Sequence, residues 1–149
     1  MSAALGMALV GCTPAATPEP TQPPTTTTAT PTPTATPTDP VLVPDGSAED
    51  NLPLFTAVMN AVYARNDATK GRPYIDALVE AGFDKSRMQL TRDKTSVGNE
   101  ADSIQFSVLW GDECLVGQIG PSVRTPTAAV VPELPSGGCL IGQTRPIDW

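Results

Sequence analysis

The sequence predicts an α+β fold, with two N-terminal helices packed on one face of a small four-stranded sheet that is either mixed or antiparallel. Apolar residues recur at helical spacing up to residue 82, and they alternate with polar residues after residue 84. Residues 45–149 carry these patterns and are long enough for one small domain with one core. We therefore expect one folded domain whose helices precede its strands.

Residues 48–66 contain the first predicted helix. Acidic residues near its start suit the positive end of a helix dipole. Pro53 lacks the backbone N–H that an internal helical position needs, so we expect the helix to begin at Pro53 rather than at Ala48. An apolar stripe typical of a core-packing helix consists of Phe55, Val58, Met59, Val62 and Tyr63.

A second helix is predicted to begin near Pro73, since proline suits a first helical turn. It should end before Gly82, which can adopt the left-handed conformation that closes many helices. Phe83 follows directly, and we expect its ring to fold back onto the apolar face of this helix. That face consists of Ile75, Leu78 and Val79.

Four strands are predicted after the second helix. Apolar residues alternate with polar ones over residues 87–91 and 103–110, as expected for half-buried strands. Gly111 and Asp112 form a two-residue hairpin signal, so residues 113–119 should pair antiparallel with the preceding strand. A last strand is predicted at residues 138–144.

A short repeat suggests how the last strand pairs. Cys-Leu-Val-Gly-Gln at 114–118 returns as Cys-Leu-Ile-Gly-Gln at 139–143. Each cysteine opens its strand, and a bond between two strand beginnings favours parallel neighbours. Residues 120–138 would then be a proline-rich crossover that keeps a helical turn within 127–131. The alternatives are a chance match and a wholly antiparallel sheet in which the disulfide joins non-neighbouring strands.

Cys12 closes the sequence Leu-Val-Gly-Cys at 9–12, which is similar to the lipobox read by a bacterial lipoprotein signal peptidase. The pattern predicts cleavage before Cys12 and a lipid on its sulfur, and two acyl chains at roughly 0.8 kcal/mol per buried CH₂ hold a domain on a membrane. Residues 1–11 are then a signal peptide that is truncated at its N-terminus, because no basic residue precedes the apolar run. The expected location is the outer face of the cytoplasmic membrane. The alternative is a free cysteine in an uncleaved N-terminus.

Residues 12–44 are predicted to form the lipidated cysteine and a stalk without a fold of its own. From residue 13 to 40 the chain is almost entirely Thr, Pro and Ala, which favours extended polyproline II over helix or sheet. At about 3.1 Å per residue, such a stalk could hold the domain on the order of 90 Å from the bilayer. Either O-glycosylation or an unmodified tether fits this composition.

Cys114 and Cys139 are predicted to form a disulfide, because a pair of cysteines outside the cytoplasm is usually bonded. Closing a loop of about 25 residues stabilises a fold by roughly 3 kcal/mol in the chain-entropy picture. The competing interpretation is a redox or metal site. The chain has no His and no Cys-x-x-Cys motif, so neither a metal nor a cofactor is expected.

The charge balance argues against a nucleic-acid partner. Nine basic residues face sixteen acidic ones, for a formal net charge of −7, and no concentrated basic face is apparent. The acidity itself is ordinary for an exported domain, which gains solubility from its net charge.

No catalytic residue is predicted, and we do not expect an enzyme. The absence of His removes the commonest general base. A dyad of Lys94 and Ser96 is conceivable, but the surrounding segment is more typical of a polar turn. Paired carboxylates for glycan hydrolysis would have to come from Asp102, Asp112 and Glu113, although Asp112 is expected in the hairpin turn.

The C-terminal residues 144–149 hold the densest group of specific side chains. Arg145 and Asp148, with the terminal carboxylate, could form an ion-pair cluster. Trp149 could pack over an open edge of the core or serve as an exposed binding anchor, and packing is the commoner outcome. A possible binding surface therefore consists of Trp110, Arg145, Asp148 and Trp149.

Four segments carry a resemblance to a known family. They are Leu-Val-Glu-Ala-Gly-Phe-Asp at 78–84, Asp-Lys-Thr at 93–95, Gly-Asp-Glu-Cys-Leu-Val-Gly at 111–117 and Thr-Arg-Pro-Ile-Asp-Trp at 144–149. On these segments the domain resembles an uncharacterised domain of actinobacterial lipoproteins and secreted proteins, over about residues 52–149. The resemblance implies an extracytoplasmic location and a common scaffold, and it transfers no catalytic residue.

These observations predict a membrane-anchored lipoprotein of the cell envelope whose domain is a non-catalytic binding or interaction module. Its partner would be an envelope protein, a glycan or a small ligand, in addition to the membrane that Cys12 reaches through its lipid. The alternatives are a purely structural surface lipoprotein and, less favoured, an enzyme that acts on cell-wall glycans.

Overall fold

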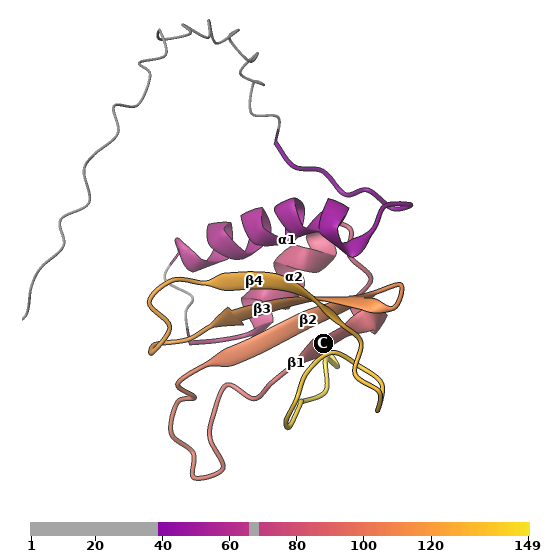
Figure 1. Cartoon of the computed structure of the whole chain (residues 1–149). Helices are drawn as coiled ribbons and strands as arrows, with labels where there is room; N and C mark the ends of the chain where they lie inside the picture. The colour runs from indigo at the N-terminus through magenta and orange to yellow at the C-terminus, as the bar shows by residue number, and fades with distance from the viewer. Residues whose placement is uncertain (1–38, 66–68) are drawn as a thin grey trace, which may run out of the picture. The chain divides into compact units, whose positions relative to one another are not determined.

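The computed structural model describes residues 39–65 and 69–149 (Figure 1). Cys12, the predicted signal peptide and the predicted stalk up to residue 38 lie outside the described residues. The described part has an α+β fold with two helices and a four-stranded antiparallel sheet. The antiparallel pairing is therefore confirmed, and the mixed sheet is wrong. The expectation that the disulfide joins two strands is also wrong, because Cys139 lies in no strand.

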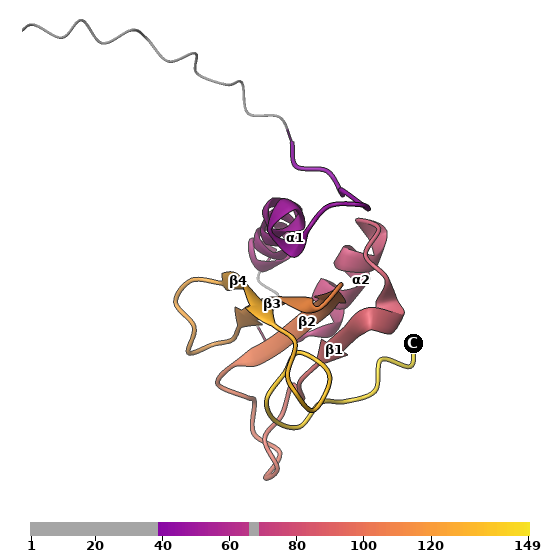
Figure 2. The same cartoon turned by 45° about the vertical axis from the view of Figure 1, so that its right-hand side comes forward.

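Each strand of the sheet pairs antiparallel with the next strand along the chain, so the sheet is a meander. Both helices cover one face of the sheet, and the C-terminal segment passes along the other face (Figure 1 and Figure 2). The elements are α1 (Ala48–Tyr63), α2 (Arg72–Glu80), a 3₁₀ turn (Lys85–Arg87), β1 (Met88–Leu90), β2 (Ile104–Trp110), β3 (Glu113–Ile119) and β4 (Thr127–Pro132).

Helix α1 begins at Ala48, so the predicted start at Pro53 is wrong. Ser47 caps the helix: its hydroxyl accepts a hydrogen bond from the Asp50 N–H at 3.2 Å, and the Asp50 carboxylate accepts one from the Ser47 N–H at 2.8 Å. Pro53 lies inside the helix on its exposed side. The missing N–H removes one helical hydrogen bond, to the carbonyl of Glu49, and both residues are exposed to solvent.

Asn51 fastens the chain that enters α1. Its side-chain oxygen accepts a hydrogen bond from the Val43 N–H at 2.8 Å, and its amide donates to the carbonyls of Val43 and Ser47, each at 2.9 Å. Asn51 is fully buried, and these bonds satisfy its amide group. Leu42 packs against the core beside them. Among the described residues, contacts with the core therefore begin at Leu42.

Helix α2 begins and ends near the predicted residues, and Ile75 and Leu78 of its predicted apolar face are buried. The assignment of Val79 to that face is wrong, because its side chain is 39% exposed. Pro73 lies in the first turn, and Gly82 takes a φ of 101° just after the helix ends. The Phe83 N–H returns to the Leu78 carbonyl at 3.0 Å, which closes the helix end. Phe83 is buried, and its ring meets that of Phe55 edge-on at 6.1 Å.

Phe106 of β2 joins both helices to the sheet. Its ring lies 5.6 Å from that of Phe55 in α1 and 5.0 Å from that of Tyr74 in α2, between centroids. Gly117 is its cross-strand neighbour in β3, and a Cβ there would come within 2.5 Å of the Phe106 ring. The missing side chain of Gly117 therefore makes room for the ring that connects the two layers.

The β2–β3 hairpin confirms the predicted turn. Gly111 has a φ of 62°, and the register runs from Ile104 opposite Ile119 to Trp110 opposite Glu113. Alternation along the strands sends one set of side chains to the helices and the other set to the opposite face.

The fourth strand is at Thr127–Pro132, so the strand predicted at 138–144 is wrong. The predicted crossover and its helical turn at 127–131 are wrong for the same reason. Strand β4 is an edge strand, where Pro132 costs no interior ladder bond, and Ala128 and Val130 pack against the core. The prolines that bound this strand therefore mark its ends and not an irregular connection.

The predicted disulfide between Cys114 and Cys139 is present, and it joins β3 to the C-terminal segment and not to another strand. The side-chain oxygen of Gln89 accepts hydrogen bonds from the N–H groups of Cys139 at 2.6 Å and Leu140 at 3.1 Å. Ile141 is 83% exposed, so the second copy of the repeat has no strand-like burial. The sequence repeat is not a structural repeat.

Ser47→Ala is expected to lower the free energy of unfolding by about 1 kcal/mol at pH 7, because it removes the cap of α1. The backbone and hydroxyl hydrogen bonds from Ser47 lower the pKa of Asp50 below its ordinary value of 3.8. A lowered carboxyl pKa stabilises the fold above the ordinary value, and this stabilisation is lost as the pH falls through the lowered one.

The difference between wild type and Ser47→Ala, measured by denaturant unfolding, should therefore narrow below about pH 3.8. Ser136→Ala is the matched control, since Ser136 is exposed in a loop. The variant keeps the backbone N–H that donates to Asp50 and loses only the bond from the hydroxyl. A pH-independent difference would therefore contradict the contribution of the bond between the Ser47 hydroxyl and the Asp50 carboxylate.

Gly117→Ala is expected to lower the free energy of unfolding by about 1–3 kcal/mol, the usual cost of extra volume in a packed core. The new methyl group would clash with the Phe106 ring. Phe106→Leu removes that ring. In a double-mutant cycle, the double variant should therefore lose less free energy of unfolding than the two single variants lose in sum. Additive losses would show that the clash lies elsewhere.

Candidate functional site

The structure brings together two of the four predicted surface residues. Arg145 and Trp149 lie in one cluster, with the Arg145 guanidinium carbon 5.0 Å from the indole centroid. Asp148 is exposed, and its side chain makes no hydrogen bond or ion pair among the described residues. Trp110 lies half-buried on Phe83, at 6.0 Å between ring centroids, and its indole N–H donates to the Gly46 carbonyl at 2.7 Å.

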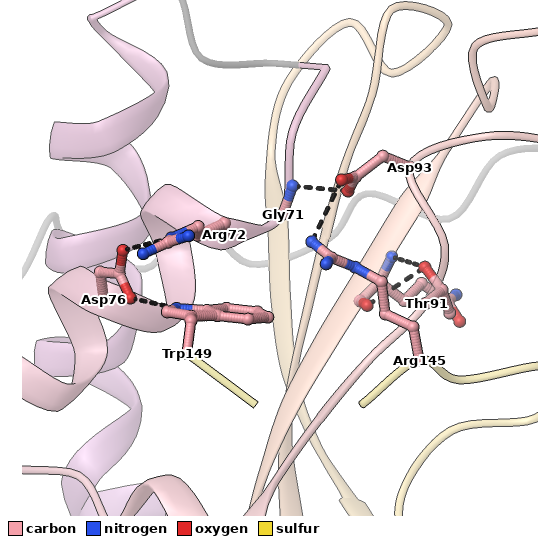
Figure 3. Close-up of polar contacts among 8 residues, drawn as sticks. Gly71, Arg72, Asp76, Thr91, Asp93, Arg145 and Trp149 are labelled. Carbon is pink, nitrogen blue, oxygen red and sulfur yellow. Dashed lines mark hydrogen bonds and ion pairs between the residues drawn. The ribbon is translucent and has the colours of Figure 1, made fainter. Parts of the chain in front are cut away.

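Trp149 is held by side chains of its own chain. Its indole N–H donates to the Asp76 carboxylate at 2.7 Å, and three cations lie near its ring: Arg72 and Arg145 at 5.0 Å and Lys85 at 5.2 Å. The Lys85 ammonium also donates to the backbone carbonyl of Trp149. Figure 3 shows the ring beside Arg72 and Asp76 of α2. Each cation–π contact contributes about 0.5–1 kcal/mol, so this tryptophan fastens the C-terminal segment.

Asp93 connects three parts of the fold (Figure 3). One carboxylate oxygen accepts the Gly71 N–H at 2.8 Å, just before α2, and the other pairs with the Arg145 guanidinium at 3.1 Å. The Asp93 and Arg145 side chains are 29% and 26% exposed. The Arg145 N–H donates to the Leu90 carbonyl at 2.8 Å. These bonds anchor the C-terminal segment beside the end of β1.

We call Trp149, Arg145, Arg72, Asp76 and Lys85 the C-terminal cluster, and the last three were not predicted from the sequence. Arg72 and Asp76 form an i,i+4 ion pair at 3.3 Å, and this spacing is visible in the sequence. The approach of Trp149 to this pair, and of Lys85 to Trp149, joins residues far apart along the chain. No local pattern could have revealed these contacts.

A hollow of about 520 Å³ lies next to this cluster, on the sheet face opposite the helices. We call it the loop hollow, because the loop between β1 and β2 and the C-terminal segment both extend from this side (Figure 1). It contains no carboxylate among its lining residues. They are Thr91, Arg92, Lys94, Thr95, Ser96, Ser103, Gln105 and Gln143.

Two of these lining residues hold the walls of the loop hollow in place. The Thr91 hydroxyl accepts the Gln105 N–H at 2.9 Å and donates to the Gln105 carbonyl at 3.3 Å, which ties the loop to β2. The Thr95 hydroxyl donates to the Asn99 carbonyl at 3.3 Å. Among the described residues, no hydrogen bond or ion pair engages the side chains of Arg92, Lys94, Ser96, Ser103, Gln105 or Gln143.

The polar turn predicted around Ser96 is present. Gly98 donates to the Thr95 carbonyl at 3.0 Å, and Lys94 pairs with Glu100 through the backbone. No hydrogen bond joins Lys94 to Ser96. Asp102 and Asp112 lie at opposite ends of β2, which spans about 20 Å at the usual rise per residue. That exceeds the separation of about 5–9.5 Å that paired glycosidase carboxylates need.

Within 39–65 and 69–149, no three or more His, Cys, Asp or Glu residues gather as a metal site would require. No helix in the same ranges is long and apolar enough to cross a bilayer.

The sequence matches the family described as "Domain of unknown function (DUF6993)" over residues 59–143. The matched region runs from α1 to the last lining residue of the loop hollow, and it includes both cysteines of the disulfide. No curated protein and no solved structure matches the chain.

Asp93→Ala is expected to lower the free energy of unfolding by about 1–2 kcal/mol, because it leaves the Gly71 N–H and the Arg145 guanidinium without their acceptor. Asp148→Ala removes the same charge from an exposed position and should change stability by less than about 0.5 kcal/mol. Denaturant unfolding at pH 7 compares the two variants. Equal losses would mean that Asp93 does not anchor the C-terminal segment.

Proposed function

Since the chain belongs to the DUF6993 family, which is defined by a domain of unknown function, we propose that it is a membrane-anchored lipoprotein of the bacterial cell envelope. Its folded domain is a non-catalytic binding module that takes its ligand in the loop hollow. The Leu-Val-Gly-Cys sequence at 9–12 supports the anchor, and the Thr- and Pro-rich segment after it supports a stalk that gives the module reach.

The loop hollow is the observation that carries the binding role. Six polar side chains line it without a hydrogen bond or ion pair elsewhere in the described residues. Unengaged donors and acceptors that converge on one concave surface are typical of sites that orient a ligand. A purely structural lipoprotein would have no need of such a concentration.

The scaffold around the loop hollow suits binding without catalysis. Gln105 belongs to β2 and Gln143 to the segment that follows the disulfide, so both positions rest on covalent or hydrogen-bonded supports. The lining offers two cations and neutral polar groups, but neither a His nor a carboxylate to act as a general base.

The protein isolated from its own membranes should begin at Cys12, carry a diacylglycerol group there and partition into detergent. Cys12→Ser should abolish the lipid and release the protein from the membrane fraction. Intact-mass and peptide analysis, before and after reduction, measures both the lipid and the disulfide. The matched control is Cys114→Ser with Cys139→Ser, which should keep the lipid.

The same preparations test the binding role by co-sedimentation with purified cell-wall material. The Cys12→Ser chain should sediment with the wall, and Arg92→Gln with Lys94→Gln should weaken that retention. An unmodified chain that begins at Met1 would refute the anchor. A lipidated chain with no retention would favour the structural lipoprotein instead.

A further inference from the structure

We propose that the loop hollow binds an anionic sugar, meaning a hydroxyl-rich ring that carries a phosphate or a carboxylate group. This inference rests on the proposed function, because it names the ligand class of the binding module. Its basis is the charge of the lining, the inventory of neutral donors and acceptors, and the absence of aromatic rings.

The loop after β1 separates charges of opposite sign. Arg92, Asp93 and Lys94 are consecutive, yet only the two cations line the loop hollow. The Asp93 carboxylate turns toward the C-terminal cluster, where the Gly71 N–H and the Arg145 guanidinium engage both of its oxygens. The negative charge is therefore neutralised outside the hollow, and both cations are left for a ligand.

Nearby acidic residues do not cancel these cations. Glu100 pairs with Lys94 only through the backbone, and its carboxylate forms no ion pair with the ammonium group. Asp102 accepts a hydrogen bond from Ser122 at 3.3 Å and does not line the hollow. In a chain with a formal net charge of −7, a hollow with two unpaired cations and no carboxylate favours an anion by charge-assisted hydrogen bonding.

The neutral lining groups indicate what carries the anion. Ser96 and Ser103 offer hydroxyls, and Gln105 and Gln143 offer amides, so each side chain can both donate and accept. Sugar hydroxyls have the same dual character. A bare inorganic anion would use the two cations but leave most of these groups without a partner.

The lining also indicates why charge is needed. No aromatic or large aliphatic side chain is among the lining residues, so a neutral sugar would find little apolar contact area there. Its hydroxyls would exchange hydrogen bonds with water for hydrogen bonds with protein, at a small net gain. Pairing of an anionic group with Arg92 and Lys94 would supply the missing affinity.

The test uses the full chain with Cys12→Ser, labelled for NMR and titrated separately with glucose 6-phosphate, glucuronate, glucose and inorganic phosphate. At least one anionic sugar should give saturable shifts at Ser96, Ser103 and the side-chain amides of Gln105 and Gln143. Its dissociation constant should be at least about tenfold lower than those of glucose and inorganic phosphate, which corresponds to about 1.4 kcal/mol.

Arg92→Gln with Lys94→Gln should weaken this binding by at least about tenfold. The matched control is Arg65→Gln with Lys70→Gln, which removes the same charge from residues that do not line the hollow, and it should bind like the parent chain. Unchanged shifts in α1 and α2 show that each variant stays folded.

The probes also distinguish the source of the charge. Binding of glucose 6-phosphate alone supports a phosphorylated sugar, and binding of glucuronate alone supports a carboxylated sugar. Binding of both shows that either anionic group is sufficient. The proposal is overturned if glucose or inorganic phosphate binds as tightly as the anionic sugars, or if no probe changes the NMR shifts of the lining residues. It is also overturned if the two double variants lose affinity equally.

Cell-wall retention separates this inference from the proposed function. If the probes fail while retention still depends on Arg92 and Lys94, the binding module stands and the ligand class is wrong. If the probes fail and retention is also absent, the binding role of the domain is refuted.

Discussion

The contact of Phe106 with both helices holds the two layers of this domain together. The ring is fully buried, and it packs on Phe55 of α1 and on Tyr74 of α2. Gly117 on the neighbouring strand makes this packing possible, because any side chain there would occupy the space of the ring. With few aromatic residues in the chain, the placement of these three decides how the helices sit on the sheet.

The structure on the sheet face opposite the helices depends on the bonds that attach the C-terminal segment to the sheet. The Cys114–Cys139 disulfide attaches it to β3, Gln89 binds its backbone, and the Asp93–Arg145 pair fixes it beside the end of β1. These supports differ in kind, since one is covalent and the others are polar. Together they cover part of a face that the helices leave open, and they hold one wall of the loop hollow.

The candidate site follows from this fastening. The Asp93 carboxylate, which anchors the C-terminal segment, lies between Arg92 and Lys94 in the sequence. It bonds to the Gly71 N–H and to Arg145, so only the two cations line the loop hollow. The structural role of Asp93 and the proposed binding role of Arg92 and Lys94 thus belong to adjacent residues. Trp149, for which the sequence favours packing over a role as a binding anchor, has a structural role, because its ring and its N–H contact α2, Lys85 and Arg145.

The sequence by itself determined the features that depend on near neighbours. Both helices, the cap at Gly82 and the turn at Gly111 follow from local spacing and backbone preference, and the disulfide follows from the cysteine count. Tertiary structure decided that β4 lies at Thr127–Pro132, because the prolines there are tolerated only on an edge strand. It also decided that Trp149 reaches α2 and that the loop hollow forms beside Asp93. Such contacts join residues far apart in the chain, and their energy depends on packing that no local pattern encodes.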